Sequence, residues 1–233
     1  MNPYRRADCP GDGLQAVGPI DVRACAFGER PAAGFSRPAL PAPALLDGMR
    51  TRTVERPERQ TQLGLGWLAP PLGHPDQAAV DLLIHILGGS RSSRLNQALR
   101  EKARLVSSIS GWYGALQGAG AIGVTAQIEG TDQAAVERGI MAEIARVQTE
   151  GVTAQELSRA ITASEAEREF SRETVEGLAL AYGRAETVWS LDAERAYLDQ
   201  VRAVTREQVQ QAARRYLTSS YARLAFVPRG RPQ

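Results

Sequence analysis

The sequence predicts an α+β domain: one antiparallel sheet with helices packed on one of its faces. Alternating apolar residues at Leu63, Leu65 and Trp67 are typical of a half-buried strand. Apolar residues at helical spacing then fill the second half of the chain. A strand-like stretch, YARLAFVP, returns at residues 221–228. Strands at both ends with helices between them favour this layered fold class.

The composition is that of an ordinary globular protein. The chain has 233 residues, 43% of them hydrophobic and 23% charged. This length can bury a core without disulfides or metals. The net charge of +2 argues against nucleic-acid binding, which usually needs a far more basic face. No run approaches the roughly 18 apolar residues of a transmembrane helix, so we expect no membrane span.

The first part of the chain differs from the rest. Prolines recur at Pro31, Pro38, Pro41 and Pro43, with glycine and alanine between them. We therefore expect residues 1–55 to be a Pro/Gly-rich, partly irregular inter-domain segment and residues 56–233 to be the α+β domain. The cysteines at positions 9 and 25 fit no metal-binding spacing, and we expect them to be unpaired.

The elements of the domain can be predicted in order. After the strand at 61–69, residues 75–89 are apolar nearly all round, which indicates a buried helix ended by glycine. Ser92 or Ser93 is expected to cap the next helix, which runs through RLNQALREKA. Residues 105–115 and 119–128 predict two strands that form a hairpin.

The second half reads as a series of helices. TAQE (153–156) and TREQ (205–208) are both capping boxes, with a hydroxyl at the cap and Glu or Gln three residues later. Between them, residues 172–203 should hold one or two more helices. An earlier helix is indicated by a stripe of four apolar residues at helical spacing: Val136, Ile140, Ile144 and Val147.

No catalytic centre can be assembled from the residues. His74 and His85 are the two histidines, and neither begins a His-x-x-Glu-His motif or its permutation. His85 is expected to be a core histidine and His74 a turn residue. GAGAIG (118–123) leads into a strand instead of a helix, so it fails as a phosphate-binding loop. We expect neither a metal nor another cofactor in this chain.

The order of the pieces resembles a known family. A strand ending in Ala-Pro is followed by an apolar helix closed by Gly-Gly, then by SSRLNQALREK, and later by a helix pair broken at EGVTAQEL. This order resembles the C-terminal, non-catalytic half of the pitrilysin/insulinase-type zinc metallopeptidases, the group that includes mitochondrial processing peptidase. The resemblance covers residues 56–228, and SSRLNQALREK is its most specific part.

The resemblance implies a two-part zinc metallopeptidase. One half carries the zinc and the His-x-x-Glu-His motif, and the other closes a chamber over the peptide substrate. This chain would be the inactive half, with zinc only in its catalytic partner. The partner would be a second half or subunit, so homo- and heterodimers are both open. The compartment is not indicated by the residues; we expect a soluble protein of the periplasm or cytoplasm of a bacterium.

The resemblance also implies two residues that contact the substrate. The family's peptide-binding arginine corresponds to Arg100, and the tyrosine seven residues later corresponds to Ser107. A guanidinium suits peptide carbonyl oxygens. Serine is shorter than tyrosine and has no aromatic ring, so peptide contact would be reduced. Tyr113 shares the strand parity of Ser107 but lies about 20 Å along the strand, too far to replace it.

Two alternatives remain open from the sequence. Arg100 can instead form an ion pair on the helix surface, because exposed arginines are common. The chain can likewise be a structural or assembly subunit that has lost peptide binding, which the serine at position 107 would allow. Arg91 and Arg94, at the start of the same helix, oppose the helix dipole and are expected to be structural or interfacial.

Overall fold

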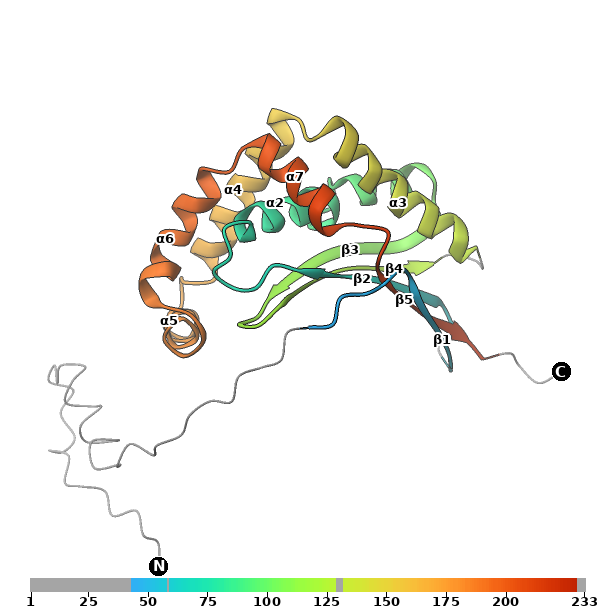
Figure 1. Cartoon of the computed structure of the whole chain (residues 1–233), viewed down its shortest axis with the longest axis horizontal. Helices are drawn as coiled ribbons and strands as arrows, with labels where there is room; N and C mark the ends of the chain where they lie inside the picture. Colours follow the sequence, from blue (N-terminus) through green and yellow to red (C-terminus); the bar gives the residue numbers. More distant parts are fainter. Residues whose placement is uncertain (1–42, 58, 129–131, 230–233) are drawn as a thin grey trace, which may run out of the picture. The chain divides into compact units, whose positions relative to one another are not determined.

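A computed structural model describes residues 43–57, 59–128 and 132–229, which all belong to one compact unit, Pro41–Gln233. Five strands form one mixed sheet in the order β1-β5-β2-β4-β3. The helices form a layer on one face of this sheet (Figure 1). The predicted α+β fold class is confirmed. Cys9 and Cys25 lie outside the described residues.

Four of the strands are those that the sequence predicts. They are β2 (Thr61–Ala69), β3 (Val106–Ala115), β4 (Gly120–Ile128) and β5 (Ala222–Pro228). β2 is antiparallel to both β4 and β5, and β3 is antiparallel to β4. The last strand of the chain therefore lies directly beside the first predicted one. Along β2 the residues Leu63, Leu65 and Trp67 face the helices and are buried.

The fifth strand, β1 (Arg50–Arg56), was not predicted. It pairs in parallel with β5, so the sheet is mixed and begins inside the segment 1–55 that we expected to be a connector. The stretch RTRTVER has no apolar alternation because it is an edge strand that is exposed over most of its length. Its backbone pairs with β5 while its side chains bury almost nothing, so a hydrophobic pattern could not reveal it.

The helical layer contains one π-helix and six α-helices within the described part of the chain. They are α2 (Gln77–Gly88), η1 (Asn96–Lys102, the π-helix), α3 (Gln133–Glu150), α4 (Ala154–Phe170), α5 (Val175–Val188), α6 (Leu191–Arg202) and α7 (Arg206–Tyr216). Among the described helices, none is long and apolar enough to cross a membrane.

α2 is the central helix of the layer and lies directly on the sheet. It is buried nearly all round, as its sequence indicates, and it crosses β3 where two glycines meet. A Cβ atom on Gly88 would lie 2.4 Å from the backbone nitrogen of Gly111. Only glycine at position 88 permits this close approach of helix and strand.

The helix predictions for the second half of the chain are confirmed. The apolar stripe of α3 is fully buried, and both capping boxes are formed, at Thr153 with Glu156 and at Thr205 with Gln208. Residues 172–203 contain the two helices α5 and α6.

The expected serine cap before η1 is wrong. The hydroxyl of Ser93 donates to the carbonyl of Ser90 at 2.7 Å, and no side chain caps the helix. The buried Asn96 side chain competes for the same groups, since its Nδ2 lies 3.2 Å from Ser93 Oγ and 3.0 Å from the Ser90 carbonyl.

Candidate functional site

Arg100 lies in the last turn of the π-helix η1. Its side chain is half-buried and forms no hydrogen bond or ion pair with any residue that the structure describes. The backbone nitrogen of Ala103 donates to the carbonyl of Ala98 at 3.0 Å, which is the wide i to i+5 turn of a π-helix. Such turns occur frequently at functional sites. The sequence left open that Arg100 forms an ion pair on the helix surface. Among the described residues, Arg100 forms no such pair.

A tight connection carries the chain from η1 into β3. Arg104 adopts a left-handed backbone conformation with φ of 52°, and the nitrogen of Leu105 donates to the carbonyl of Leu99 at 2.9 Å. η1 packs directly against β3. Arg100 and Ser107 therefore lie on two consecutive elements that contact each other.

Ser107 occupies an irregularity at the start of β3. The pairing with β4 shifts between Val106 and Ser108, which makes Ser107 the extra residue of a β-bulge. Its hydroxyl donates to the carbonyl of Gln127 at 3.4 Å. The side chain is thus partly used within the domain.

The bulge overturns the parity argument for Tyr113. Alternation along a strand holds only where pairing is regular, and the extra residue breaks it between position 107 and the remainder of β3. The Tyr113 hydroxyl donates to the carbonyl of Pro70 at 2.8 Å, and burial raises the pKa of this hydroxyl. Tyr113 connects β3 to the end of β2.

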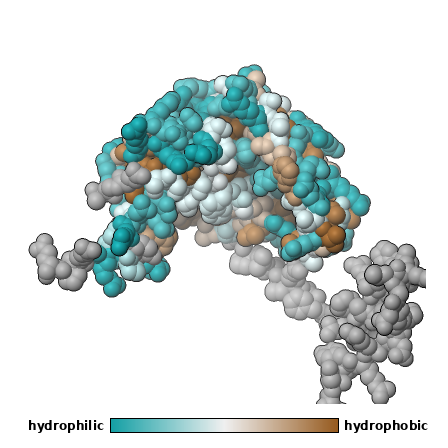
Figure 2. Space-filling view, turned by 180° about the vertical axis from the view of Figure 1, so that it is seen from behind, coloured by the Kyte–Doolittle hydropathy of each residue, from teal (hydrophilic) through white to brown (hydrophobic). Residues whose placement is uncertain are grey.

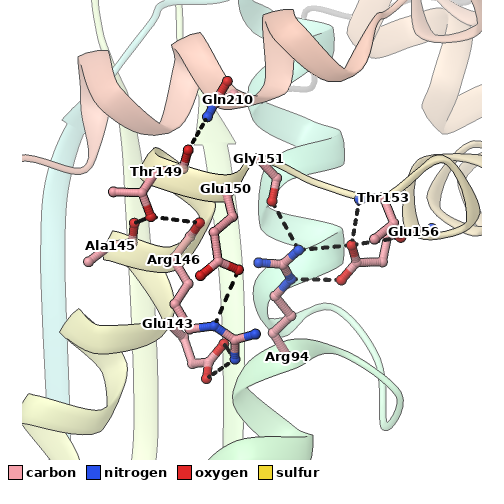
Figure 3. A network of polar contacts seen from close by, with 10 residues as sticks. All are labelled: Arg94, Glu143, Ala145, Arg146, Thr149, Glu150, Gly151, Thr153, Glu156 and Gln210. Carbon is pink, nitrogen blue, oxygen red and sulfur yellow. Dashed lines mark hydrogen bonds and ion pairs between the residues drawn. The ribbon is translucent and has the colours of Figure 1, made fainter.

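Arg94 is held by partners within the domain. Its Nε and Nη2 donate to the two carboxylate oxygens of Glu156 at 2.7 and 2.9 Å, and Nη2 also donates to the carbonyl of Gly151 at 3.0 Å (Figure 3). The side chains of Arg94 and Glu156 are 14% and 26% exposed. The hydrogen bond from Arg94 is the main reason that the pKa of Glu156 falls to about 2. This pair attaches the segment just before η1 to the first turn of α4.

Arg91 differs from Arg94 in its exposure and in the partners of its side chain. It is exposed, and its side chain makes no hydrogen bond or ion pair among the residues described. Only its carbonyl is engaged, where it accepts from Gln97 Nε2 at 3.3 Å. Of the three arginines singled out in the sequence, Arg94 is structural, whereas Arg91 and Arg100 keep their charges available.

Asn96 is a positioning residue that the sequence analysis missed. It is buried, and its Nδ2 lies 3.0 Å from the carbonyl of Ile109 in β3, in addition to its contacts with the turn before η1. One side chain thereby joins the loop, the π-helix and the strand. A polar amide between the buried residues Leu95 and Leu99 was the available signal, because buried amides require several partners.

The titratable residues of α2 do not form a metal site. Burial is the main reason that the pKa of Asp81 rises to about 7, and the charge of Glu167 adds to this effect. Asp81 accepts a hydrogen bond from Tyr197, which connects α2 to α6. Burial lowers the pKa of His85. Over the ranges 43–57, 59–128 and 132–229, no three His, Cys, Asp or Glu side chains are grouped closely enough to bind a metal. These residues do not fit a zinc ion.

Comparison with known proteins identifies the family. The sequence profile described as "Peptidase M16 inactive domain" matches residues 24–164, which is more than half of the chain. The chain belongs to the peptidase M16 inactive-domain family. The resemblance indicated by SSRLNQALREK is therefore confirmed, and the chain is a non-catalytic domain of the zinc-protease type.

Relatives agree with this assignment. An uncharacterized zinc protease of Bacillus subtilis, YmxG, is 25% identical over 182 residues, which cover 76% of this chain and 44% of the relative. The structure of a Helicobacter pylori protease superposes with a TM-score of 0.82 at 20% identity, covering 90% of this chain and 51% of that one.

A third similar protein is itself described as an inactive domain. This peptidase M16 inactive domain from Pseudomonas fluorescens superposes with a TM-score of 0.75 at 23% identity, covering 86% of this chain and 48% of that one. The chain spans about half the length of all three of these relatives.

Proposed function

We propose that this chain completes the peptide-binding chamber of a two-part zinc metallopeptidase, opposite a half that carries His-x-x-Glu-His. Zinc belongs to that catalytic half, and this chain contributes binding surface. The domain would work in the periplasm or cytoplasm of a bacterium. The family membership supports the pairing, and relatives about twice as long leave room for a second half.

The observation that carries the proposal is the free charge of Arg100. In the same segment, Arg94 is bound by Glu156 and Gly151 through Nε and Nη2, and its buried Nη1 has no partner in the described part of the chain. Arg100 has no partner at all among the described residues and is half-buried on a π-turn. A positioned guanidinium without an internal partner is suited to the carbonyl oxygens of a bound peptide. Ser107, on the adjoining strand, is the proposed second contact and would make a shorter one.

The test uses the chain reconstituted with a candidate catalytic half, with turnover of a fluorogenic peptide as the readout. Arg100→Ala should lower kcat/KM by roughly 10- to 150-fold, which corresponds to the loss of one charge-assisted hydrogen bond of about 1.5–3 kcal/mol. The melting temperature should barely change. Arg159→Ala is the matched control, because Arg159 is exposed on α4 and has no ion pair in the described part of the chain.

The second variant tests the serine position. Ser107→Tyr should leave turnover unchanged or raise it, because tyrosine restores the longer contact at this position. If Arg100→Ala lowers only the melting temperature, Arg100 is structural and the proposed contact is wrong. The alternative function, an assembly subunit without peptide binding, predicts tight association with the catalytic half and no effect of either variant on turnover.

A further inference from the structure

One face of the sheet has no helix on it. The helical layer covers the face on which the buried side chains of β2 lie, and none of the described helices covers the other (Figure 1). The outer surface of the helical layer, along the top of Figure 2, is largely hydrophilic, as expected of a surface in water. We call the uncovered side of the sheet the open face. It consists of Gln62, Gly64 and Gly66 on β2 and of the residues in line with them on the other four strands.

The middle of the open face is not polar. A sheet face that is simply in contact with water normally carries polar side chains. Here Gly64 and Gly66 occupy the middle of β2, Leu224 lies beside them on β5, and Trp112 lies on β3. Leu224 and Trp112 are 36% and 49% exposed. Exposed apolar surface in the middle of an uncovered sheet marks a place where another molecule packs.

The charges of the open face are all positive. Glu55 is the one acidic residue in the five described strands, and the register of β1 against β5 places it on the helix side. Arg50, Arg52 and Arg56 alternate with Glu55 along β1, so they lie on the open face. All three arginines are exposed, and none has a carboxylate partner among the residues described. The guanidinium of Arg56 lies over the ring of Phe226 at 5.3 Å.

A hollow of about 360 Å³ lies in the middle of the open face. Gly64 forms its floor, and Leu224 and Phe226 of β5 form an apolar wall on the side next to β1. The opposite wall carries Ser110 and Thr125, whose hydroxyls are 3.1 Å apart. A Cβ atom at Gly64 would meet only the carbonyl oxygen of Leu224, at 3.8 Å, so the space above the floor is open. The hollow can therefore accept an apolar side chain, and the arginines of β1 lie beside its apolar wall.

An occupant of the open face has to satisfy its own backbone. The inner strands β5, β2 and β4 are paired on both sides, so their backbone N–H and C=O groups are used within the sheet. An extended peptide lying across the face would find no backbone partners there, whereas an α-helix forms its backbone hydrogen bonds internally. Gly64 and Gly66 have no side chains to hold such a helix away. The arginines along β1 require carboxylates on the side of the helix that faces them.

We infer that the open face binds an acidic amphipathic helix of a partner polypeptide, with an apolar side chain in the hollow and carboxylates against Arg50 and Arg52. The same face of a second copy would bring arginines and no carboxylates from its strands. Nucleic acid is disfavoured because the arginines line only β1 and the middle of the face is uncharged. A flat bilayer surface would leave the hollow unfilled. This inference depends on neither Arg100 nor Ser107.

The test measures binding of dye-labelled synthetic peptides to the full chain by fluorescence anisotropy. Two helical peptides share one leucine–alanine face and differ only in glutamate or lysine flanks. A third has the composition of the glutamate peptide, but its apolar residues alternate as in a strand. The glutamate helix should bind most tightly, and added salt should weaken its binding. Leu224→Ser, which leaves the charge unchanged, should weaken it about tenfold. The double variant Arg50→Glu, Arg52→Glu should reverse the preference between the two helices.

The matched control is the double variant Arg138→Glu, Arg159→Glu, which changes the net charge equally but on exposed positions of the helices α3 and α4. It should leave the preference for the glutamate helix in place. Equal binding of both helices, or equally tight binding of the alternating peptide, would overturn the inference. So would an oligonucleotide or anionic vesicles whose binding the Arg50→Glu, Arg52→Glu variant abolishes, or a dimer of the chain that Leu224→Ser dissociates, since another occupant would then cover the open face.

Discussion

The ion pair between Arg94 and Glu156 should make a large, pH-dependent contribution to stability. Glu156→Gln removes the charge while keeping the size of the side chain and its place in the capping box with Thr153. Arg94 would keep its bond to the Gly151 carbonyl at 3.0 Å but would lose its carboxylate partner. The guanidinium would then be a mostly buried charge without an opposite charge in contact.

The magnitude follows from the pKa of Glu156. Folding lowers this pKa from 4.5 to about 2. At ~1.36 kcal/mol for each tenfold change in the ionisation constant, the ceiling is roughly 3.4 kcal/mol. Because the carboxylate is 26% exposed, solvent screens part of this interaction, and we expect a loss of about 2–3 kcal/mol near pH 7. For a domain of this size the melting temperature should fall by roughly 4–12 °C.

The stability difference between the parent and Glu156→Gln should depend on pH in a defined direction. A carboxylate whose pKa is lowered by folding stabilises the fold above the unfolded pKa, and this contribution is lost as the pH falls through the folded pKa. The difference between parent and variant should therefore be full above about pH 5 and should shrink steadily from pH 4.5 towards pH 2. Urea unfolding followed by circular dichroism at a series of pH values measures it.

The control is the same substitution later in α4. Glu165 pairs with Arg202 at 2.6 Å, but the arginine is 53% exposed. Surface pairs of this kind contribute about 0.2–1 kcal/mol, so Glu165→Gln should have a small effect. Equal losses for both variants, or a loss at Glu156 that persists unchanged to pH 2, would refute the argument from the buried pair.

Three further predictions concern the backbone and α2. Arg104→Gly should raise the free energy of unfolding by about 1 kcal/mol, because Arg104 has a φ of 52° that glycine adopts without strain; chemical denaturation would measure it. Gly88→Ala should lower that free energy by about 1–3 kcal/mol, because its methyl group would meet the backbone of Gly111; an unchanged melting temperature would contradict the close contact. Asp81 has its pKa raised from 3.8 to about 7, so its contribution to stability decreases as the pH rises through this range. Asp81→Asn should therefore raise the melting temperature at pH 8 and leave it nearly unchanged at pH 3.5.

The sequence by itself determined the helices and strands in which buried residues recur at the regular spacing of a helix or a strand. The alternation in β2, the stripe in α3 and the two capping boxes each depend on contacts within one element or on one buried face, so the pattern of residues reveals them. The family was accessible for a related reason, since SSRLNQALREK is a continuous motif. The candidate residue Arg100 came from that resemblance.

Only the tertiary structure decided the features that depend on contacts between distant residues. β1 is an exposed edge strand whose partner lies in β5, at the other end of the chain, so no local pattern marks it. The roles of the arginines depend on whether a carboxylate of another element lies within contact distance. Glu156 of α4 pairs with Arg94, and none of the described carboxylates contacts Arg100. The bulge at Ser107 is set by its pairing with β4, which ended the parity argument for Tyr113. An ion pair and the register of two strands each depend on two segments that are distant in the sequence. The residues of one segment alone therefore cannot reveal them.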